Sequence, residues 1–118
     1  MDTAELGKKG ELEALNYLLG QGYRLIKKNH RTRLGEVDLI VAKEEFLVFV
    51  EVKTRKESRH NISPLLSVTP KKCQKIIQLC EEYRSENELY QLQPRFDVIG
   101  IIACKNGQFL FEHIVNAF

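Results

Sequence analysis

Residues 36–53 read Glu-Val-Asp-Leu-Ile-Val-Ala-Lys-Glu-Glu-Phe-Leu-Val-Phe-Val-Glu-Val-Lys, and this stretch decides the fold. The runs 36–42 and 47–53 are rich in β-branched and aromatic residues, a composition that is typical of β-strands. Only residues 43–46 separate the two runs. We therefore expect one tight antiparallel hairpin with a two-residue turn at Glu44-Glu45.

That turn sets the register of the hairpin. It places Asp38 opposite Glu51 and Glu36 opposite Lys53, with all four side chains on one face of the sheet. The other face carries apolar side chains only: Val37, Leu39, Val41, Val48, Val50 and Val52.

Two carboxylates that face each other across a hairpin repel, by up to roughly 1 kcal/mol in water and by more at low dielectric. Ile40 and Phe49 share the charged face, which indicates that this face is partly covered and that the repulsion needs a compensating charge. A Mg²⁺ or Mn²⁺ ion bound by Asp38 and Glu51, with Lys53 beside it, would supply that charge. The alternative is a solvated face on which oppositely charged side chains pair across the strands.

The chain is expected to form a single domain over residues 1–118. It is 43% hydrophobic and 29% charged, which is an ordinary composition for a globular protein. It contains no apolar run near the roughly 20 residues that span a bilayer, and its first residues lack the features of a signal peptide. We therefore expect a cytoplasmic protein without a membrane segment. The three cysteines lack a Cys-x-x-Cys spacing, which favours reduced, packed thiols over a zinc site.

Basic residues gather on both sides of the acidic hairpin, although the net charge is only +2. An acidic centre flanked by basic segments suits a polyanion whose phosphate is also reached by a metal ion. The partner expected from this pattern is a nucleic acid, and the alternative is that the basic segments are solvated loops. The side chains expected to contact phosphates are Arg31, Arg33, Arg55, Lys71, Lys72 and Lys75.

The first helix is expected to begin at Asp2, where Asp-Thr-Ala-Glu fits a capping box, and to end at Gly20 or Gly22. At about 100° per residue Glu11 falls on the apolar stripe of this helix, so its carboxylate is expected to point toward the sheet. The alternative is a residue at the rim of the stripe that reaches water. The stripe comprises Leu12, Ala14, Leu15, Leu18 and Leu19.

The remaining elements are a short strand over 23–26, a loop over 29–33, a polar connection over 55–68, a helix capped by Thr69 with Pro70 in its first turn, a strand over 95–103, a type I′ turn over 105–108 and a strand over 109–115. The second helix is expected to bury one stripe and to leave its lysines outward. The expected stripe is Cys73, Ile76, Ile77, Cys80 and Tyr83. This order of elements predicts an α/β fold with a mixed central β-sheet flanked by helices.

Asp38, followed after a gap by Glu51-x-Lys53, resembles the active-site signature of the PD-(D/E)xK nuclease superfamily. Glu11 looks like the helix glutamate of the Holliday-junction-resolvase branch of that superfamily. Over nearly its whole length the chain is identified as a member of the YraN family of bacterial proteins, which are related to those resolvases. The resemblance rests on Gly7-Lys-Lys-Gly-Glu11, Asn29-His-Arg31, Gly35-Glu-Val-Asp-Leu-Ile40, Phe49-Val-Glu-Val-Lys-Thr-Arg55, Arg95-Phe-Asp-Val98 and Asn116-Ala-Phe118.

This resemblance implies a restriction-endonuclease-like fold, nucleic-acid binding and a Mg²⁺ site at Asp38 and Glu51. Two stretches depart from the pattern. Val37 stands where the superfamily name has proline, and residues 61–64 lack the glycine that the family leads one to expect. Asp97 matches a family position and is a further candidate, which either reaches the site or pairs with its neighbour Arg95.

The candidate residues suit phosphodiester hydrolysis. A Mg²⁺ ion at Asp38 and Glu51 would polarise the phosphate and lower the pKa of an attacking water. Lys53 would orient that water or stabilise negative charge, and Glu11 would help to position the metal. The expected function is metal-dependent cleavage of branched or structured DNA, and the alternatives are a nucleic-acid-binding module that does not cut and a structural adaptor. Coordinated cutting of two strands needs two centres, so we expect a homodimer, with 109–118 as a candidate edge.

Overall fold

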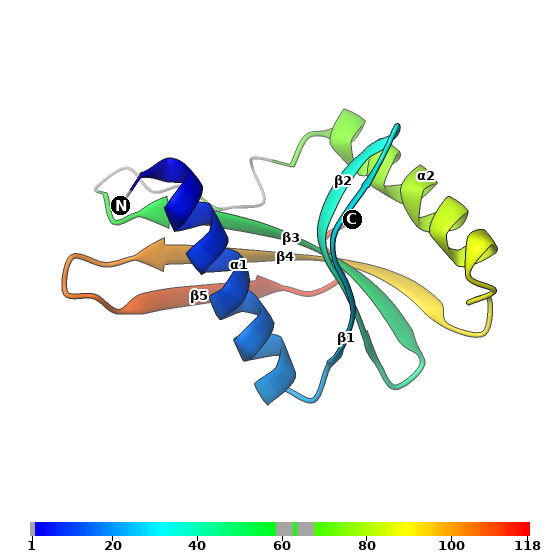
Figure 1. Ribbon diagram of the computed structural model, residues 1–118, viewed down its shortest axis with the longest axis horizontal. Helices are drawn as coiled ribbons and strands as arrows, with labels where there is room; N and C mark the ends of the chain where they lie inside the picture. Colours follow the sequence, from blue (N-terminus) through cyan, green and yellow to red (C-terminus); the bar gives the residue numbers. More distant parts are fainter. Residues whose placement is uncertain (1, 59–62, 64–67) are drawn as a thin grey trace.

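The fold is a five-stranded mixed β-sheet with α-helices packed on its two faces (Figure 1). The computed structural model describes residues 2–58, 63 and 68–118. Most of the predicted connection after residue 58, including three of the four residues of the 61–64 departure, lies outside the described residues. The elements in chain order are α1 (Thr3–Gly20), β1 (Arg24–Thr32), β2 (Gly35–Lys43), β3 (Phe46–Lys56), α2 (Pro70–Glu86), β4 (Gln93–Ala103) and β5 (Phe109–Ile114).

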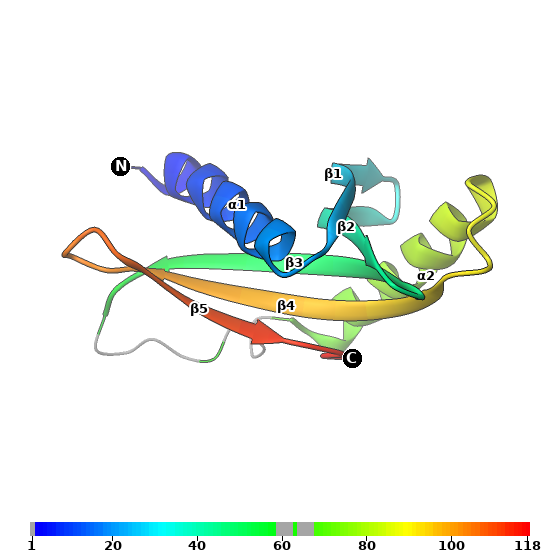
Figure 2. The same cartoon turned by 90° about the horizontal axis from the view of Figure 1, so that it is seen from below.

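The strands lie side by side in the order β1-β2-β3-β4-β5. β3 and β4 run parallel, and every other neighbouring pair is antiparallel. Parallel neighbours need a long crossover, and α2 lies within the one that joins β3 to β4. In Figure 2, α1 lies on one side of the long β3 and β4 strands and α2 lies toward the other side. This arrangement confirms the predicted α/β class with a mixed central β-sheet flanked by helices.

Each helix closes its own hydrophobic core against the sheet, as a two-faced sheet requires. The core under α1 contains Ala14, Leu15, Leu18, Tyr23, Leu39, Val41, Val48, Val50, Val52, Ile99 and Ile101. The core under α2 contains Val37, Ile40, Leu47, Phe49, Ile76, Leu79, Cys80 and Tyr83. The alternating side chains of β2 and β3 therefore serve both cores.

Both helices begin at the predicted capping residues. The Asp2 carboxylate accepts a hydrogen bond from the Glu5 backbone N–H at 2.8 Å. The Thr69 hydroxyl accepts one from the Lys72 backbone N–H at 3.2 Å, and Pro70 follows the cap directly. The second cap matters for the site, because it fixes the first turn of α2 and with it the starting point of the Lys72 side chain.

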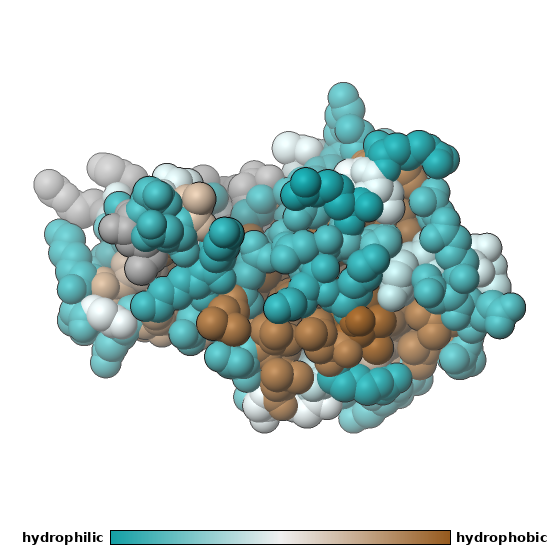
Figure 3. All heavy atoms as spheres, in the orientation of Figure 1, coloured by the Kyte–Doolittle hydropathy of each residue, from teal (hydrophilic) through white to brown (hydrophobic). Residues whose placement is uncertain are grey.

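The buried face of α1 is narrower than the sequence pattern predicts. Its buried residues follow a ridge with a spacing of four, and Leu12 and Leu19 lie off this ridge, 55% and 47% exposed. Both were predicted to be buried, and the prediction is wrong because the helix touches the sheet along one line only. Figure 3 shows hydrophobic atoms gathered over α1 and β1. The buried residues of the ridge and its flank are Leu6, Gly10, Ala14, Leu15 and Leu18.

Gly10 lets α1 lie directly on β3. A Cβ atom added at Gly10 would overlap the Thr54 hydroxyl and would lie only 2.8 Å from Thr54 Cβ. A Cβ added at Gly7, one turn earlier, would meet nothing within 4 Å. The contact between Gly10 and Thr54 therefore sets the distance of α1 from the sheet, and Glu11 is the next residue along the helix.

The predicted hairpin is confirmed at its turn and along its first five pairs. β2 and β3 pair from Lys43 and Phe46 at the turn to Leu39 and Val50 in the predicted register, and Glu44 adopts a left-handed conformation with a φ of 55°. Beyond Leu39, toward Gly35, β2 pairs with β1 alone.

This change of partner corrects three predictions about β2. Glu36 pairs with Arg31 of β1, so it does not lie in a ladder with Lys53. The ladder with β3 likewise stops before Asp38. Val37 packs in the core under α2, although alternation from Leu39 predicts the opposite face. The common cause is that β2 follows β1 away from β3, as in Figure 1, where the β1–β2 ribbon leaves the plane of the other strands.

β1 is longer than predicted and takes in most of the segment 29–33 that the sequence predicts to be a loop. The strand is irregular, with a register shift between Leu25 and Lys27 and a left-handed φ of 50° at Asn29. Its residues are mostly exposed, so the strand lacks the apolar alternation by which strands are predicted from sequence. Pairing with β2 overrides the weak local signal.

α2 buries a slightly different stripe from the predicted one. Ile76, Cys80 and Tyr83 are buried as predicted, but Leu79 is buried and Ile77 is 42% exposed. A rotation of the helix by a fraction of a turn accounts for both changes. The same rotation turns Lys72 toward the sheet, so the prediction that it lies outward is wrong.

The hairpin between β4 and β5 is confirmed, but its turn differs from the predicted type I′. Gly107 has a φ of 88°, whereas Asn106 keeps a negative φ. The Gly107 N–H donates to the Cys104 carbonyl at 3.0 Å, and the Cys104 N–H donates to the Gln108 carbonyl at 2.8 Å. This pattern is a turn followed by a glycine bulge, the common solution for a three-residue hairpin loop.

Neither helix of the described ranges is long and apolar enough to cross a membrane. The three cysteines are free thiols, as predicted. Cys80 is buried in the α2 core, and burial raises the pKa of its thiol to about 12, so this thiol stays protonated and unreactive.

Candidate functional site

The candidate site lies at the fork where β2 separates from β3. The last ladder pair before the fork is Leu39 with Val50. One residue further, the Asp38 carboxylate accepts a hydrogen bond from the Val52 backbone N–H at 2.8 Å. A side chain therefore replaces the missing strand contact, and it holds one Asp38 oxygen against β3. The predicted pairing of Asp38 with Glu51 across the ladder is therefore wrong, and Asp38 is held instead by the backbone N–H of Val52, the residue after Glu51.

Glu51 lies on β3 at this fork and is 4% exposed. Its Oε2 atom lies 2.7 Å from Lys72 Nζ and 3.7 Å from Lys53 Nζ. Lys53 comes from the same strand, two residues along, and Lys72 comes from the first turn of α2. A buried carboxylate needs such partners. The sequence predicted Lys72 as an outward phosphate contact, and nothing in the pattern indicated this ion pair with Glu51.

The Asp38 carboxyl group is shifted furthest toward its protonated form among the acidic groups of the site. Burial, followed by the negative charge of Glu51, raises the pKa of Asp38 to about 7, although the hydrogen bond from Val52 N–H opposes the shift. The carboxylates of Glu11 and Glu36 raise the same pKa further. A cluster of carboxylates with this property binds either protons or a cation, because like charges at low dielectric cannot all remain uncompensated.

The two lysines of the site respond differently to their surroundings. Burial, with the neighbouring Lys72 ammonium, lowers the pKa of Lys53. Burial alone would also lower the pKa of Lys72, but its hydrogen bond to Glu51 outweighs burial and raises it. Lys72 is therefore the firm ion-pair partner of Glu51. Lys53 is held nearby without a strong partner of its own, which leaves its ammonium available to another anion.

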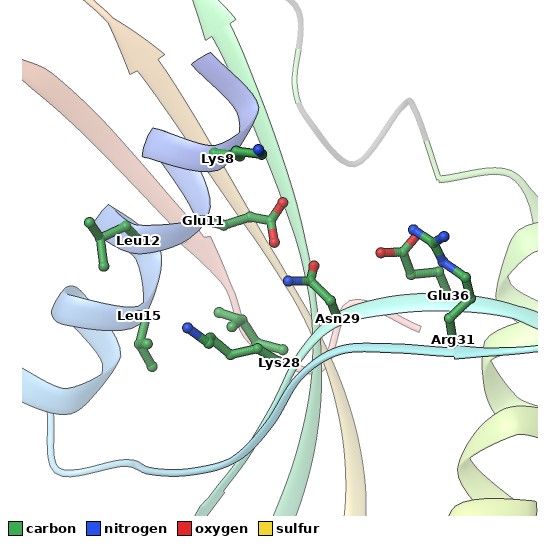
Figure 4. A pocket seen from close by; sticks show the side chains of 9 residues that line it. Lys8, Glu11, Leu12, Leu15, Lys28, Asn29, Arg31 and Glu36 are labelled. Atoms are coloured by element: carbon green, nitrogen blue, oxygen red, sulfur yellow. The ribbon is translucent and has the colours of Figure 1, made fainter. Parts of the chain in front are cut away.

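Glu11 points from α1 into the space beside this fork, as Figure 4 shows. It is partly buried, and burial followed by the charges of Glu36 and Glu51 raises the pKa of its carboxyl group. In Figure 4 the Asn29 side chain extends toward Glu11 from β1. The predicted orientation of Glu11 toward the sheet therefore agrees with the structure, and its carboxylate lies within electrostatic range of Asp38 and Glu51.

An open cleft of about 560 Å³ adjoins the site between α1 and the β1–β2 ribbon (Figure 4). Glu11 and Glu36 contribute its acidic groups, and three basic side chains line it as well. The lining residues are Lys8, Glu11, Leu12, Leu15, Lys28, Asn29, Arg31, Glu36 and Leu39.

Asp97 does not join Asp38 and Glu51, and it forms a separate buried network at the other end of α1. Its carboxylate pairs with Arg95, at 2.8 and 3.0 Å, and with His113 Nε2 at 2.7 Å. The Asn116 backbone N–H donates to it at 3.0 Å, and the other His113 nitrogen meets the Tyr17 hydroxyl at 3.0 Å. Of the two alternatives left by the sequence, pairing with Arg95 is correct.

Burial alone would raise the pKa of Asp97, but its hydrogen bonds to His113, Arg95 and the Asn116 N–H lower it. The network ties β4 to β5 and, through Tyr17, to α1. Its geometry is that of a structural clamp. The candidate site therefore comprises Glu11, Asp38, Glu51, Lys53 and Lys72, without Asp97.

The basic residues predicted to contact phosphates occupy several places around the fork. Arg31 and Arg33 are mostly exposed and make loose ion pairs, at 3.3 Å with Glu36 and at 3.7 Å with Glu82. Lys71 and Lys75 are exposed on α2, and Arg55 is partly exposed on β3. Lys72 is the exception, since Glu51 engages it.

The donor set at the fork fits a small divalent cation. Mg²⁺ is bound in many proteins by only one or two carboxylates, with water and phosphate oxygens as its other ligands. Asp38 and Glu51 supply two carboxylates, and burial together with the charge of Glu51 raises the pKa of Asp38. A ready-made cluster of three metal-ligating side chains is not found within the described ranges, so the fit rests on two ligands.

Its fold and site define the protein as a mixed α/β domain that holds a cluster of carboxylates and two lysines at the point where β2 separates from β3. Residues 10–101 match the Uncharacterised protein family UPF0102, and the chain belongs to this family. It is 42% identical over 119 residues to a UPF0102 protein of Pelobacter propionicus, covering 99% of this chain and 84% of that one. It is 39% identical over 118 residues to a UPF0102 protein of Clostridioides difficile, covering all of both chains.

The family match supports the family identity inferred from the sequence, whereas the relation to Holliday junction resolvases stays a prediction. Among solved structures, the chain is similar to Pyrococcus furiosus SfsA in complex with Ca²⁺. The TM-score is 0.38 and the sequence identity 18%, with 98% of this chain and 64% of that chain covered. A likeness of this size carries no argument about function.

Proposed function

We propose that this protein is a metal-dependent nuclease that hydrolyses phosphodiester bonds in branched or otherwise structured DNA. The observation that carries the proposal is the convergence of Asp38, Glu51 and Lys53 at one fork, with the pKa of Asp38 raised to about 7. Such a pair of carboxylates favours binding of a divalent cation, and a lysine beside it can stabilise negative charge on a phosphate. The substrate class follows from the resemblance to the resolvases.

Each residue has a role that its position supports. Asp38 and Glu51 would hold the Mg²⁺ or Mn²⁺ ion, which supplies charge stabilisation and lowers the pKa of a water nucleophile. Lys53, whose ammonium has no strong partner, is placed to stabilise charge on the scissile phosphate or to orient the water. Glu11 adds negative charge on the α1 side and would help to position the metal through water.

The test is a cleavage assay with labelled four-way junction, flap, single-stranded and duplex DNA, in Mg²⁺, in Mn²⁺ and in EDTA. We expect metal-dependent cleavage, strongest on junction or flap, and none by Asp38→Asn. Binding of these substrates without cleavage in either metal would contradict the proposal and favour the non-catalytic binding module. A folded protein without affinity for any of them at low salt would favour the adaptor.

Lys53→Ala separates chemistry from binding. This variant should lose cleavage while its DNA affinity stays within a few-fold of wild type, because one charge among many phosphate contacts matters more to the reaction than to affinity. Lys105→Ala, an exposed lysine in the β4–β5 turn, is the matched control and should keep both. Cleavage by Lys53→Ala at the wild-type rate would remove Lys53 from the mechanism.

We place the activity in the cytoplasm, where its DNA substrates lie. Paired cutting of a junction requires two centres, and β5 offers an edge with exposed Leu110 and Phe111 for a two-fold homodimer. Sedimentation with and without a four-way junction tests this. A protein that stays monomeric in both conditions and binds the junction one to one would exclude paired cleavage by a dimer.

A further inference from the structure

The cleft between α1 and the β1–β2 ribbon has basic side chains on both of its walls. Lys8 comes from α1, and Lys28 and Arg31 come from β1. Lys8 and Lys28 are exposed, and neither forms an ion pair in the described part of the chain, although the charge of Lys28 acts on Glu11. Ammonium groups that line a groove in this way attract phosphates.

Apolar groups lie between these charges. Leu12 is 55% exposed and lines the cleft together with Leu15 and Leu39. Asn29 adds an amide that projects into the same space, as Figure 4 shows. A groove of cations, apolar surface and one amide matches the parts of a nucleotide, which are a phosphate, a sugar and base with apolar faces, and polar base edges.

The size of the cleft limits what it holds. Its volume of about 560 Å³ lies within the range of roughly 300–1,000 Å³ that accommodates one small organic ligand. A short stretch of one polynucleotide strand fits this space, whereas the two strands of a duplex do not. The described lining includes no aromatic ring, so contacts to phosphate dominate and sequence preference is small.

The cleft also leads to the carboxylates. Glu11 and Glu36 line it, and both charges raise the pKa of Asp38, so the cleft and the fork belong to one electrostatic region. A strand lying in the cleft would bring a phosphate toward Asp38 and Glu51. Arg31 also lines the cleft, where it forms an exposed ion pair with Glu36 at 3.3 Å. A bound phosphate can replace Glu36 as the partner of Arg31.

We propose that this cleft binds a single polynucleotide strand, with phosphates on Lys8, Lys28 and Arg31 and the sugar or base on Leu12, and that it delivers the strand to the fork. The inference rests on the proposed function and names the form of substrate that the site admits. Branched DNA would enter as one unpaired strand at the branch point.

The test measures binding in EDTA, where no metal-dependent cleavage occurs. Fluorescence anisotropy would be recorded with a labelled oligodeoxythymidylate, the matching oligouridylate and a blunt DNA duplex, for wild type, the Lys8→Ala/Lys28→Ala double variant and the Lys105→Ala/Lys56→Ala double control. At about 0.1 M salt, loss of two phosphate contacts to a single strand lowers affinity roughly 25-fold and flattens the log–log salt slope by about 1.4. The comparison of the two oligonucleotides tells DNA from RNA.

We expect wild type to bind the single strand more tightly than the duplex, and the cleft variant to lose that preference while the control keeps it. Equal losses in the cleft variant and the control, or a preference for duplex, would overturn the inference. Since the assay needs no metal, its outcome is separate from the nuclease proposal. If wild type binds the single strand as expected but does not cleave DNA, the nuclease proposal fails and the inference about the cleft stands. If wild type cleaves DNA but the cleft variant binds the single strand as tightly as wild type, only the inference about the cleft fails.

Discussion

Lys72 Nζ lies 2.7 Å from Glu51 Oε2, so a cation from α2 occupies the position where a metal ligated by Glu51 would need access. Lys53 approaches the same oxygen only to 3.7 Å. The Glu51 carboxylate is thus neutralised chiefly from the helix, while the Asp38 carboxylate next to it has a raised pKa. A divalent cation at the fork would have to compete with Lys72 for Glu51.

Lys72→Met should therefore raise the affinity for Mn²⁺, by roughly five-fold, the equivalent of about 1 kcal/mol for a partly exposed ion pair. The measurement is calorimetric titration of Mn²⁺ into the DNA-free protein. Lys71→Met, which removes an exposed lysine from the same helical turn, is the control and should leave the affinity unchanged. Equal affinities for wild type and Lys72→Met would show that Lys72 does not compete for the site.

Gly7 and Gly10 form a matched pair for testing how α1 lies on β3. Gly7→Ala should stabilise the protein by about 0.5–1 kcal/mol, because its site is open and alanine favours the helix. Gly10→Ala should destabilise it by roughly 1–3 kcal/mol, because the new Cβ overlaps Thr54. Chemical denaturation measures both, and a stabilised Gly10→Ala variant would contradict the close approach of helix and strand.

Asp38 makes the metal-free protein sensitive to pH. Its carboxyl group has a folded-state pKa of about 7 and an ordinary value of 3.8, so the folded protein binds this proton more tightly than the unfolded chain. In EDTA, the free energy of unfolding should therefore fall as the pH rises from 4 to 7, by up to roughly 4 kcal/mol from this group. Asp38→Asn should flatten that decline. Parallel pH profiles for the two proteins would show that the pKa of Asp38 is ordinary.

Asp97→Asn should destabilise the protein by roughly 3 kcal/mol, because it leaves the largely buried Arg95 guanidinium without its counter-charge. The pKa of Asp97 is lowered, so its contribution is present above pH 4 and is lost as the pH falls below that value. Glu81→Gln, which weakens the more exposed pair with Arg84, is the control and should cost less than about 1 kcal/mol. Equal denaturation midpoints for the two variants would contradict the role of Asp97 as a clamp.

The strongest local signals predicted the fold. Alternation and a short connection indicated the β2–β3 hairpin and its register up to Leu39. Capping residues at Asp2 and Thr69 located the starts of both helices. The predicted β1 was too short because most of the strand is exposed and therefore lacks the apolar alternation that indicates a strand in the sequence. Its pairing with β2 depends on the tertiary structure. The same pairing draws β2 away from β3, which no local pattern indicates.

The positions of the candidate residues were predicted only in part. Glu11, Asp38, Glu51 and Lys53 were found from spacing on one helix and one hairpin, and they converge at the fork. Lys72 comes from an element far along the chain, and its direction depends on a small rotation of α2 that helical periodicity does not specify. Asp97 was ambiguous because its partners His113 and Asn116 lie on a different segment.

Calorimetric titration of Mn²⁺ into wild type and Asp38→Asn, without DNA and at a pH above 7, tests the central claim most directly. Asp38 is ionised there in the wild type, so the carboxylate pair is complete. We predict saturable binding of about one ion per chain by wild type and loss of the binding heat in Asp38→Asn. Equal binding by both proteins, or no binding by wild type, would contradict a cation site at Asp38 and Glu51.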